Sequence, residues 1–436
     1  MRTKIVSPGE SAGYFPRWRL KSGGVIKPDE RLPWAQTIIF GLQHSVVMAG
    51  AIIVPLVMGF DPSLALFCSG IGTFIFFLVV AGRVPSYLGA SGSFSAVVIA
   101  VTSYSGHGPN QHLDVALGGI VAAGVLYGVI ALLVMRLGSR WVERLMPPVV
   151  TGSIVVAIGI NFAPFAARSI SGGALDASVG LFIILVIVVS AVAAPGIWRR
   201  LSVLIGAITG YLLYLFLANG LGLARPIDFN ALATAPWIGL PGFTAPSFRA
   251  DALLLIAPVA IVLVAENLGH IKAIGMVTGS NMDHLIGRAF LGDSVATILS
   301  GLCGGTPVTT YAENIGIMAA TNVYSTLIFA VTAAVSLLLG CSPKFGVLLQ
   351  SIPGPVLGGL SIVLFGLIAA TGGRIWVENK VDFTDPRNLL TAAFALMAGA
   401  GNLTLKFGAI TLGGVGTAAF GSIALYQLLT YASWKE

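Results

Sequence analysis

The chain has 436 residues, of which 56% are hydrophobic and only 9% are charged, and its mean hydropathy is +0.92. A soluble domain carries about 25% charged residues, so this composition excludes a soluble globular protein and favours a polytopic membrane protein. The net charge of +7 does not indicate nucleic-acid binding, because the basic residues are spread over predicted tails and loops, and we expect no nucleic-acid partner.

The predicted elements begin with a polar, basic tail over residues 1–33, which has no apolar core of its own and is expected to be cytoplasmic. Apolar runs of about 17–25 residues then indicate spanning helices. In chain order they lie at 34–58, 62–81, 113–136, 148–166, 177–195, 201–221, 251–271, 285–301, 323–341, 353–372, 386–400 and 411–431. Two shorter apolar pieces, 94–104 and 313–321, each follow a Pro/Gly-rich stretch. If both are half-helices completed by extended chain, the prediction is fourteen crossings.

The distribution of basic residues supports this count. With the N-terminus in the cytoplasm, only Arg168, Arg225, Arg249, Lys344 and Lys406 fall outside, and the other 19 of the 24 Lys and Arg residues fall inside. Such an excess is what the positive-inside rule requires. We therefore expect a multi-pass protein of the inner (plasma) membrane with both termini in the cytoplasm, including a short tail at 432–436.

The two halves of the chain carry weak internal similarity. Residues 148–159 resemble residues 355–366, and the Pro/Gly-rich segment 83–89 corresponds to 304–307. These matches fall in the same order in both halves, which predicts a seven-plus-seven inverted repeat. Matched, interrupted segments are the best sequence indication of a transporter's binding site, because broken backbone at membrane depth must line a cavity or be buried in protein.

Three acidic residues lie well inside predicted spans: Glu266, Asp293 and Glu313. A charged side chain at the bilayer centre costs about 2.5–3.5 kcal/mol, so we expect each to have a role. Glu266 and His270 are four residues apart on one helix face and suit either a proton-loading pair or a structural hydrogen bond between helices. Glu313 opens a half-helix and would contact a ligand or cap the helix N-terminus. Asp293 would either bind the proton or the substrate, or form structural contacts with the broken backbone.

Other polar and aromatic residues have weaker assignments. Gln43 and His44, in the first span, are expected to support the site rather than bind the ligand directly. Phe94 opens the first half-helix and would either lie against a flat ligand or pack in the core. The histidines show no metal-binding spacing. A phosphate-binding loop with a Lys-Ser/Thr pair is also absent from the sequence. We therefore expect no metal, no cofactor other than an ion gradient, and no enzyme activity.

Four segments together resemble the nucleobase–ascorbate (nucleobase–cation symporter-2) transporter family. They are Gln43-His44, Ala265-Glu-Asn-Leu-Gly-His270, Leu291-Gly-Asp293, and Thr309-Thr-Tyr-Ala-Glu-Asn-Ile-Gly-Ile-Met-Ala-Ala-Thr321. The resemblance extends from about residue 32 to residue 431, and the stretch around Glu313 is its most specific part.

The resemblance implies an all-α polytopic fold with fourteen transmembrane segments, short antiparallel β-strands in spans 3 and 10, and a homodimer. It also implies that a core domain moves like an elevator against a gate domain. The expected boundaries are 34–141 (core, spans 1–4), 142–250 (gate, spans 5–7), 251–342 (core, spans 8–11) and 343–431 (gate, spans 12–14).

The family pattern further implies that Glu266 and Glu313 hydrogen-bond a nucleobase and that His270 tunes Glu266 as the proton-coupled group. Backbone N–H groups near Phe94 and at Ala312 would complete the contacts. Thr310, Tyr311 and Asn314 would support the site. Two positions depart from the pattern: Ala312 stands where uracil transporters have Gly, and Asn322 stands where a basic residue is usual.

The substrate implied by the Glu-Asn-x-Gly form is uracil, which offers two ring N–H donors to carboxylates. A xanthine or urate permease of the same family is the alternative, since those bases offer similar donors. A channel belongs to a different class and would show a ring of like residues rather than one asymmetric acidic site. The titratable Glu266–His270 pair favours proton over sodium coupling.

Overall fold

The computed structural model describes residues 13–47, 49–104, 108–195, 197–200, 202–407 and 410–432. Residues 1–12 of the predicted N-terminal tail, and residues 433–436 of the C-terminal one, lie outside the described residues. The helices are α1 (Trp34–Val47), α2 (Ala49–Met58), α3 (Pro62–Val79), α4 (Ser95–Thr102), α5 (Leu113–Leu137), α6 (Arg140–Leu145), α7 (Pro148–Asn161), α8 (Ala163–Ile170), α9 (Ala174–Ala193), α10 (Ile197–Arg200), α11 (Ser202–Leu215), α12 (Asn230–Thr234), α13 (Ala250–Ile256), α14 (Val259–Thr278), α15 (Ile286–Cys303), α16 (Ala312–Thr321), α17 (Thr326–Gly340), α18 (Pro343–Gln350), α19 (Gly354–Glu378), α20 (Pro386–Ala400) and α21 (Gly414–Ala432). Short turns of other helix types are η1 (Gly92–Phe94), η2 (Phe216–Gly220) and η3 (Asp283–Leu285). The strands are β1 (Arg19–Leu20), β2 (Glu30–Arg31), β3 (Leu88–Ala90), β4 (Val308–Thr310), β5 (Leu405–Phe407) and β6 (Ile410–Leu412).

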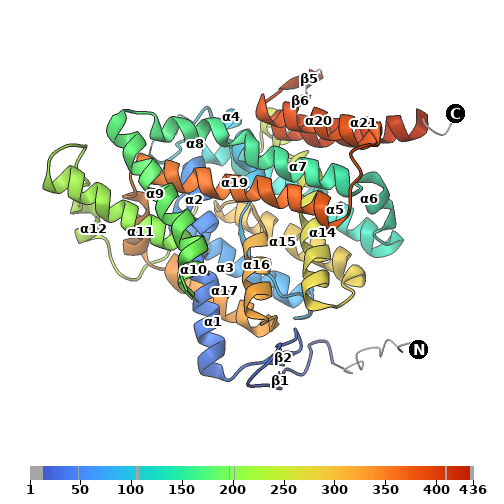
Figure 1. Cartoon of the computed structure of the whole chain (residues 1–436), viewed down its shortest axis with the longest axis horizontal. Helices are drawn as coiled ribbons and strands as arrows, with labels where there is room; N and C mark the ends of the chain where they lie inside the picture. The colour runs from blue at the N-terminus through green and yellow to red at the C-terminus, as the bar shows by residue number, and fades with distance from the viewer. Residues whose placement is uncertain are drawn as a thin grey trace.

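The molecule is mostly helical and polytopic (Figure 1). Among the described residues, eight helical stretches are long and apolar enough to cross a membrane, or nine if the bent pair α17–α18 counts as one span. Helices shorter than a full span, such as α4 and α16, are not included in that number. The expected fourteen crossings therefore remain a prediction.

A short sequence signal starts several of these helices. Asp61, Ser342 and Asp385 each precede a proline, and each side chain accepts a hydrogen bond from the backbone N–H two or three residues further on, at 2.8, 3.4 and 2.9 Å. Proline fits the first helical position because its missing N–H would have no helical partner there. The capping side chain satisfies one of the remaining N–H groups. These caps fix the starts of α3, α18 and α20.

The helices pack in two groups. Helix α15 packs against α3 and α5, and α17 packs against α3 and α1. In the second group α7 packs against α19, α20 and α21, and α9 packs against α11 and α19. Figure 1 shows α7 and α19 side by side across the molecule. Their closest approach needs glycine, because a Cβ atom on Gly372 would lie 2.6 Å from the carbonyl oxygen of Gly152.

The two interrupted segments meet as a β-ladder. Strands β3 and β4 pair antiparallel, with Leu88 opposite Thr310 and Ala90 opposite Val308. Each strand leads into a short helix, β3 through η1 into α4 and β4 into α16. The ladder hydrogen bonds satisfy backbone groups that would otherwise be unpaired at membrane depth. The expectation that a strand in each half would pair antiparallel is confirmed for these two strands.

Gly89 is required at the centre of β3, and this leads to a first prediction. A Cβ atom there would lie 2.5 Å from Cζ of Tyr311, whose hydroxyl donates a 2.7 Å hydrogen bond to the carbonyl oxygen of Ala90. We expect Gly89→Ala to displace the ring and lower the free energy of unfolding by about 1–3 kcal/mol, the usual cost of overpacking. The measurement is the thermal unfolding midpoint of the purified protein in detergent.

The matched control for this prediction is Gly373→Ala in α19, where a Cβ atom meets nothing within 4 Å. We expect its midpoint to equal or slightly exceed that of the wild type, because Ala is the better helix former. Equal midpoints for the two variants would contradict the close packing of Gly89 and Tyr311.

The described part of the N-terminal segment packs against the end of α16. Ile26 donates from its N–H to the carbonyl oxygen of Asn322 at 2.9 Å and accepts from the N–H of Tyr324 at 2.8 Å. The indole of Trp18 donates to the hydroxyl of Thr326 at 2.8 Å. Asn322 is the C-cap of α16 and has φ 56°, ψ 30°. Asparagine tolerates this left-handed conformation better than most residues, which gives Asn322 a structural role where a basic residue was expected.

Candidate functional site

A cavity of about 420 Å³ lies between α7 and α19 on one side and the η1 turn, α14 and the start of α16 on the other. One wall comes from the η1 turn, from α14, and from β4 with the start of α16. The opposite wall comes from α7 and α19, and α2 contributes Ile53 and Val54. Most of the lining is apolar, so its few polar groups determine what it can bind.

Glu266 is the first acidic group in this cavity. It lies in α14, and the hydroxyl of Ser93 in η1 donates a 2.9 Å hydrogen bond to its Oε2 atom. His270, one turn further along α14, lines the same cavity, as their four-residue spacing predicts. The sequence pattern indicated Phe94 at this turn and gave no signal for its neighbour Ser93.

Glu313 is the second acidic group and lies in the first turn of α16. Tyr311 and Ala312 precede it, and all three line the cavity. The N-terminal end of a helix carries a partial positive charge that stabilises a nearby anion. Glu266 and Glu313 line the same cavity, which therefore presents two half-buried carboxyl groups from different segments.

A buried polar cluster extends from the cavity wall, where Thr309 and Thr310 lie, into the interior of the protein. The side-chain amide of Asn267 donates to Oδ2 of Asp293 at 2.6 Å and to the hydroxyl of Thr309 at 3.2 Å. The hydroxyl of Thr310 donates to Oδ1 of Asn267 and lies 2.8 Å from Nδ1 of His270. Asp293 is fully buried and is not among the cavity-lining residues. Asn267 had no assigned role in the sequence analysis, although it lies between Glu266 and His270.

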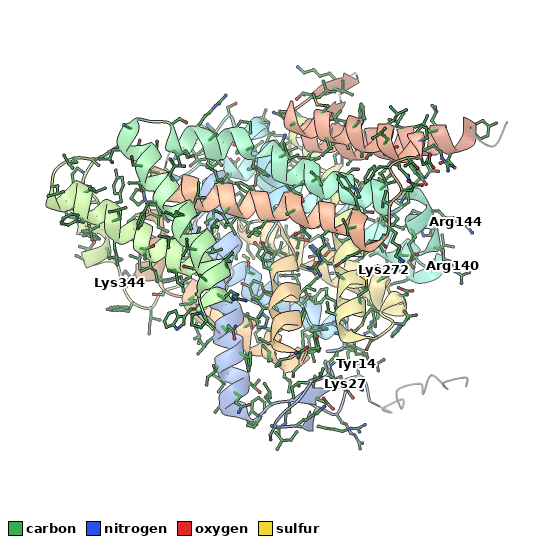
Figure 2. All side chains as sticks on the ribbon, in the orientation of Figure 1. Tyr14, Lys27, Arg140, Arg144, Lys272 and Lys344 are labelled. Carbon is green, nitrogen blue, oxygen red and sulfur yellow. The ribbon has the colours of Figure 1, made fainter. Side chains whose placement is uncertain are left out.

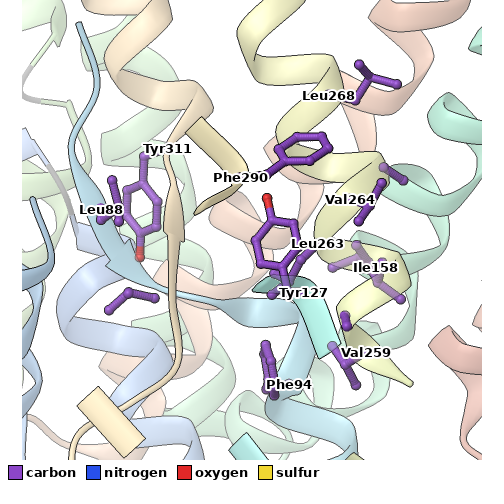
Figure 3. Packing of buried hydrophobic residues seen from close by; sticks show 14 of the residues in the cluster. Leu88, Phe94, Tyr127, Ile158, Val259, Leu263, Val264, Leu268, Phe290 and Tyr311 are labelled. Atoms are coloured by element: carbon purple, nitrogen blue, oxygen red, sulfur yellow. The ribbon is translucent and has the colours of Figure 1, made fainter. Parts of the chain in front are cut away.

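The remaining predicted residues pack around the site and do not line the cavity. Phe94 is fully buried and packs in the same hydrophobic cluster as Tyr127 and Val259 (Figure 3). The ring of His44 lies 4.8 Å from that of Phe329, and His44 is hydrogen-bonded to the side chain of Asn314. Gln43, its neighbour in α1, is also buried.

The other end of the cavity carries an ion pair on α19. Nε of Arg374 donates to Oε1 of Glu378 at 2.6 Å, and both residues line the cavity. The guanidinium side chain is 65% exposed, so this end is open to solvent. In the sequence the pair has only an i, i+4 spacing, which is common on solvated helix faces.

Charged groups also mark the ends of the molecule. Lys272 in α14 forms ion pairs with Asp283 at 2.6 Å and with Glu143 of α6 at 3.2 Å. Figure 2 shows Lys272 close to Arg140 and Arg144 on one side of the molecule, with Lys344 on the opposite side. Over the described residues, no group of three or more His, Cys, Asp or Glu side chains is arranged to hold a metal ion.

This architecture occurs in solved transporters. The fold matches the transmembrane domain of the cyanobacterial bicarbonate transporter BicA, with a TM-score of 0.58, 17% identity and coverage of 90% of this chain and 97% of that one. It matches murine Slc26a9, an anion transporter, with a TM-score of 0.63, 11% identity and coverage of 92% and 69%. The fold and the apolar helices define a polytopic integral membrane protein.

The sequence comparisons give the family. The model of the permease family Xan_ur_permease matches residues 35–407. A pyrimidine permease of Escherichia coli (strain K12), RutG, is 54% identical over 421 residues, which cover 95% of each chain. The uracil permease of Bacillus caldolyticus is 38% identical over 397 residues (88% of this chain, 89% of that one), and that of Bacillus subtilis (strain 168) is 34% identical over 420 residues (92% and 94%). The chain belongs to the xanthine–uracil permease family, the nucleobase–cation symporter family, whose members are transporters rather than enzymes.

Proposed function

We propose that this protein is a proton-coupled symporter that carries a nucleobase, most specifically uracil, into the cell. The observation that carries the proposal is the meeting of Glu266 and Glu313 in one cavity. Uracil has two ring N–H groups and two carbonyl oxygens. Each carboxylate accepts one N–H, and the carbonyl oxygens take backbone N–H groups at the start of α16 and beside Ser93. Relatives named as uracil and pyrimidine permeases support this substrate.

The transport mechanism is proposed to be an elevator movement of a core domain against a gate domain. The two groups of helices support this division, since α1, α3, α5, α15 and α17 belong to the expected core and α7, α9, α11, α19, α20 and α21 to the expected gate. The cavity lies between α14 and α16 of the expected core and α7 and α19 of the expected gate, so sliding the core past the gate would expose it to alternate sides of the membrane. We also propose that the chain crosses the membrane fourteen times as a seven-plus-seven inverted repeat and that the protein is a homodimer.

The orientation follows from the charges. In the view of Figure 2, Arg140, Arg144 and Lys272 lie at one end of the molecule and Lys344 at the other. The positive-inside rule would place the cluster of three in the cytoplasm. The protein would then lie in the inner (plasma) membrane with both termini in the cytoplasm. The open end of the cavity at Arg374 and Glu378 would be the route of release into the cell.

The experiment that tests the proposal measures binding of uracil, xanthine and urate to the purified protein at pH 6 and pH 8, with uptake into proteoliposomes. We expect uracil to bind best. We also expect tighter binding and faster uptake at pH 6, because a proton that binds with the substrate favours the loaded state by mass action. Stronger binding of xanthine or urate would overturn the substrate, and binding of none of the three would overturn the function.

A further inference from the structure

The buried polar cluster beside the cavity contains a continuous series of hydrogen bonds. It runs from Asp293 through Asn267 and Thr310 to His270. Their exposed fractions are 0%, 1%, 1% and 8%. Because these side chains have little or no exposed surface, their polar atoms depend mainly on one another for hydrogen bonds, and a mismatched donor or acceptor would cost free energy.

The series has a fixed direction, set at its Asp293 end. The side-chain NH₂ group of Asn267 donates to Asp293 and to the hydroxyl of Thr309, and these two contacts fix the direction in which the amide points. The carbonyl oxygen of Asn267 then faces Thr310 and must receive a donor. Thr310 has a single hydroxyl hydrogen, which it donates to this oxygen.

The last link concerns His270. The hydroxyl oxygen of Thr310, having donated its hydrogen, can only accept from Nδ1 of His270, which lies 2.8 Å away. Nδ1 must therefore carry the hydrogen when the imidazole is neutral. The second ring nitrogen, Nε2, is left with a lone pair, on a side chain that lines the substrate cavity.

We propose that Asp293 is a positioning residue that acts through Asn267 and Thr310 to hold His270 as its Nδ1–H tautomer. Nε2 is thereby kept as a hydrogen-bond acceptor for the cavity. Its partner is an N–H group of the ligand or a proton. The ligand's identity rests on the proposed function, but the tautomer does not.

The test reads the tautomer directly by nitrogen NMR of protein labelled with ¹⁵N-histidine. The chain has five histidines, and the His270 signals are assigned from their loss in His270→Gln. We expect a protonated Nδ1 and an unprotonated Nε2 in the wild type. Thr310→Val removes the hydroxyl at nearly constant volume and should give a mixture of tautomers or the Nε2–H form.

Two variants control for indirect effects. Thr310→Ser keeps the hydroxyl and should keep the Nδ1–H form. Thr309→Val removes the neighbouring hydroxyl, which contacts Asn267 but not His270. This variant should also keep the Nδ1–H form. If either control changes the tautomer as Thr310→Val does, or if wild-type His270 is protonated at Nε2, the proposal is wrong.

A transport measurement separates positioning from a purely structural role. We expect Thr310→Val to raise KM for uracil by about tenfold, the effect of one lost hydrogen bond in a buried site, with Thr310→Ser within about twofold of the wild type. A purely structural role would lower the yield of folded protein and leave the tautomer unchanged, which would contradict the proposal. An Nδ1–H tautomer in a protein that binds no nucleobase would overturn the proposed function and leave this inference standing.

Discussion

Replacing Glu313 with Gln is expected to weaken uracil binding by about 10- to 100-fold, the effect of losing a hydrogen bond to a charged acceptor. Glu313 lies in the first turn of α16 and faces the cavity. As a carboxylate it can accept two N–H groups and is stabilised by the helix N-terminus. Gln has nearly the same shape, but one acceptor oxygen becomes an NH₂ donor that opposes the ring N–H of the base. Isothermal titration calorimetry on the purified variants measures the change.

The matched control for this prediction is Glu378→Gln at the open end of the same cavity. Glu378 lines the cavity but pairs with Arg374, so its loss should change uracil affinity by less than about twofold, as for exposed ion pairs in general. If Glu313→Gln binds uracil as the wild type does while remaining folded, Glu313 is not a ligand contact.

Replacing Glu266 with Gln is expected to abolish proton-driven uptake while leaving binding within about tenfold of the wild type. The introduced amide can still accept a hydrogen bond from Ser93 and from a base, because its oxygen replaces one carboxylate oxygen. It cannot take up or release a proton, so it cannot couple a proton gradient to transport. Uptake of labelled uracil into proteoliposomes with an imposed pH gradient, beside equilibrium binding, separates the two effects.

Ser93→Ala is the matched control for Glu266→Gln. It removes the hydroxyl that donates to Glu266 at 2.9 Å but keeps the titratable group. We expect weaker binding with proton-driven uptake retained. If Glu266→Gln still accumulates uracil at the wild-type rate when the pH gradient is applied, another group carries the proton.

The sequence predicted much of the fold because long apolar runs have few alternatives in a membrane. The predicted half-helix at 313–321 corresponds to α16, and the predicted span at 386–400 coincides with α20. The predicted span at 251–271 lies within one helical stretch of membrane-spanning length, Ala250–Thr278, which has a short break between α13 and α14. Pro258 has no N–H to donate, and it lies between α13 and α14. The hairpin β5–β6 is too short to be recognised by period-two alternation.

The sequence identified the two acidic groups that the structure brings to one cavity, together with the nearby Thr310 and Tyr311, but it did not identify Ser93 or Asn267. Glu266 and Glu313 stand out because a carboxyl group in an apolar run has a high cost. Ser93 and Phe94 are adjacent, and the η1 turn decides that the hydroxyl faces the cavity and the ring faces the core. Asn267 contacts side chains of α15 and β4 that are distant from it in the sequence. A local sequence pattern therefore does not predict its role.

The pairing of β3 with β4 also bears on how the protein is made. Leu88 belongs to the first half of the chain, and its ladder partner Thr310 belongs to the second. During synthesis β3 emerges long before β4, so its peptide groups have no strand to bond with, and lipid offers none. The first half-helix therefore cannot take its final place in the bilayer until the second half has been inserted. The binding site is expected to be among the last parts of the molecule to fold.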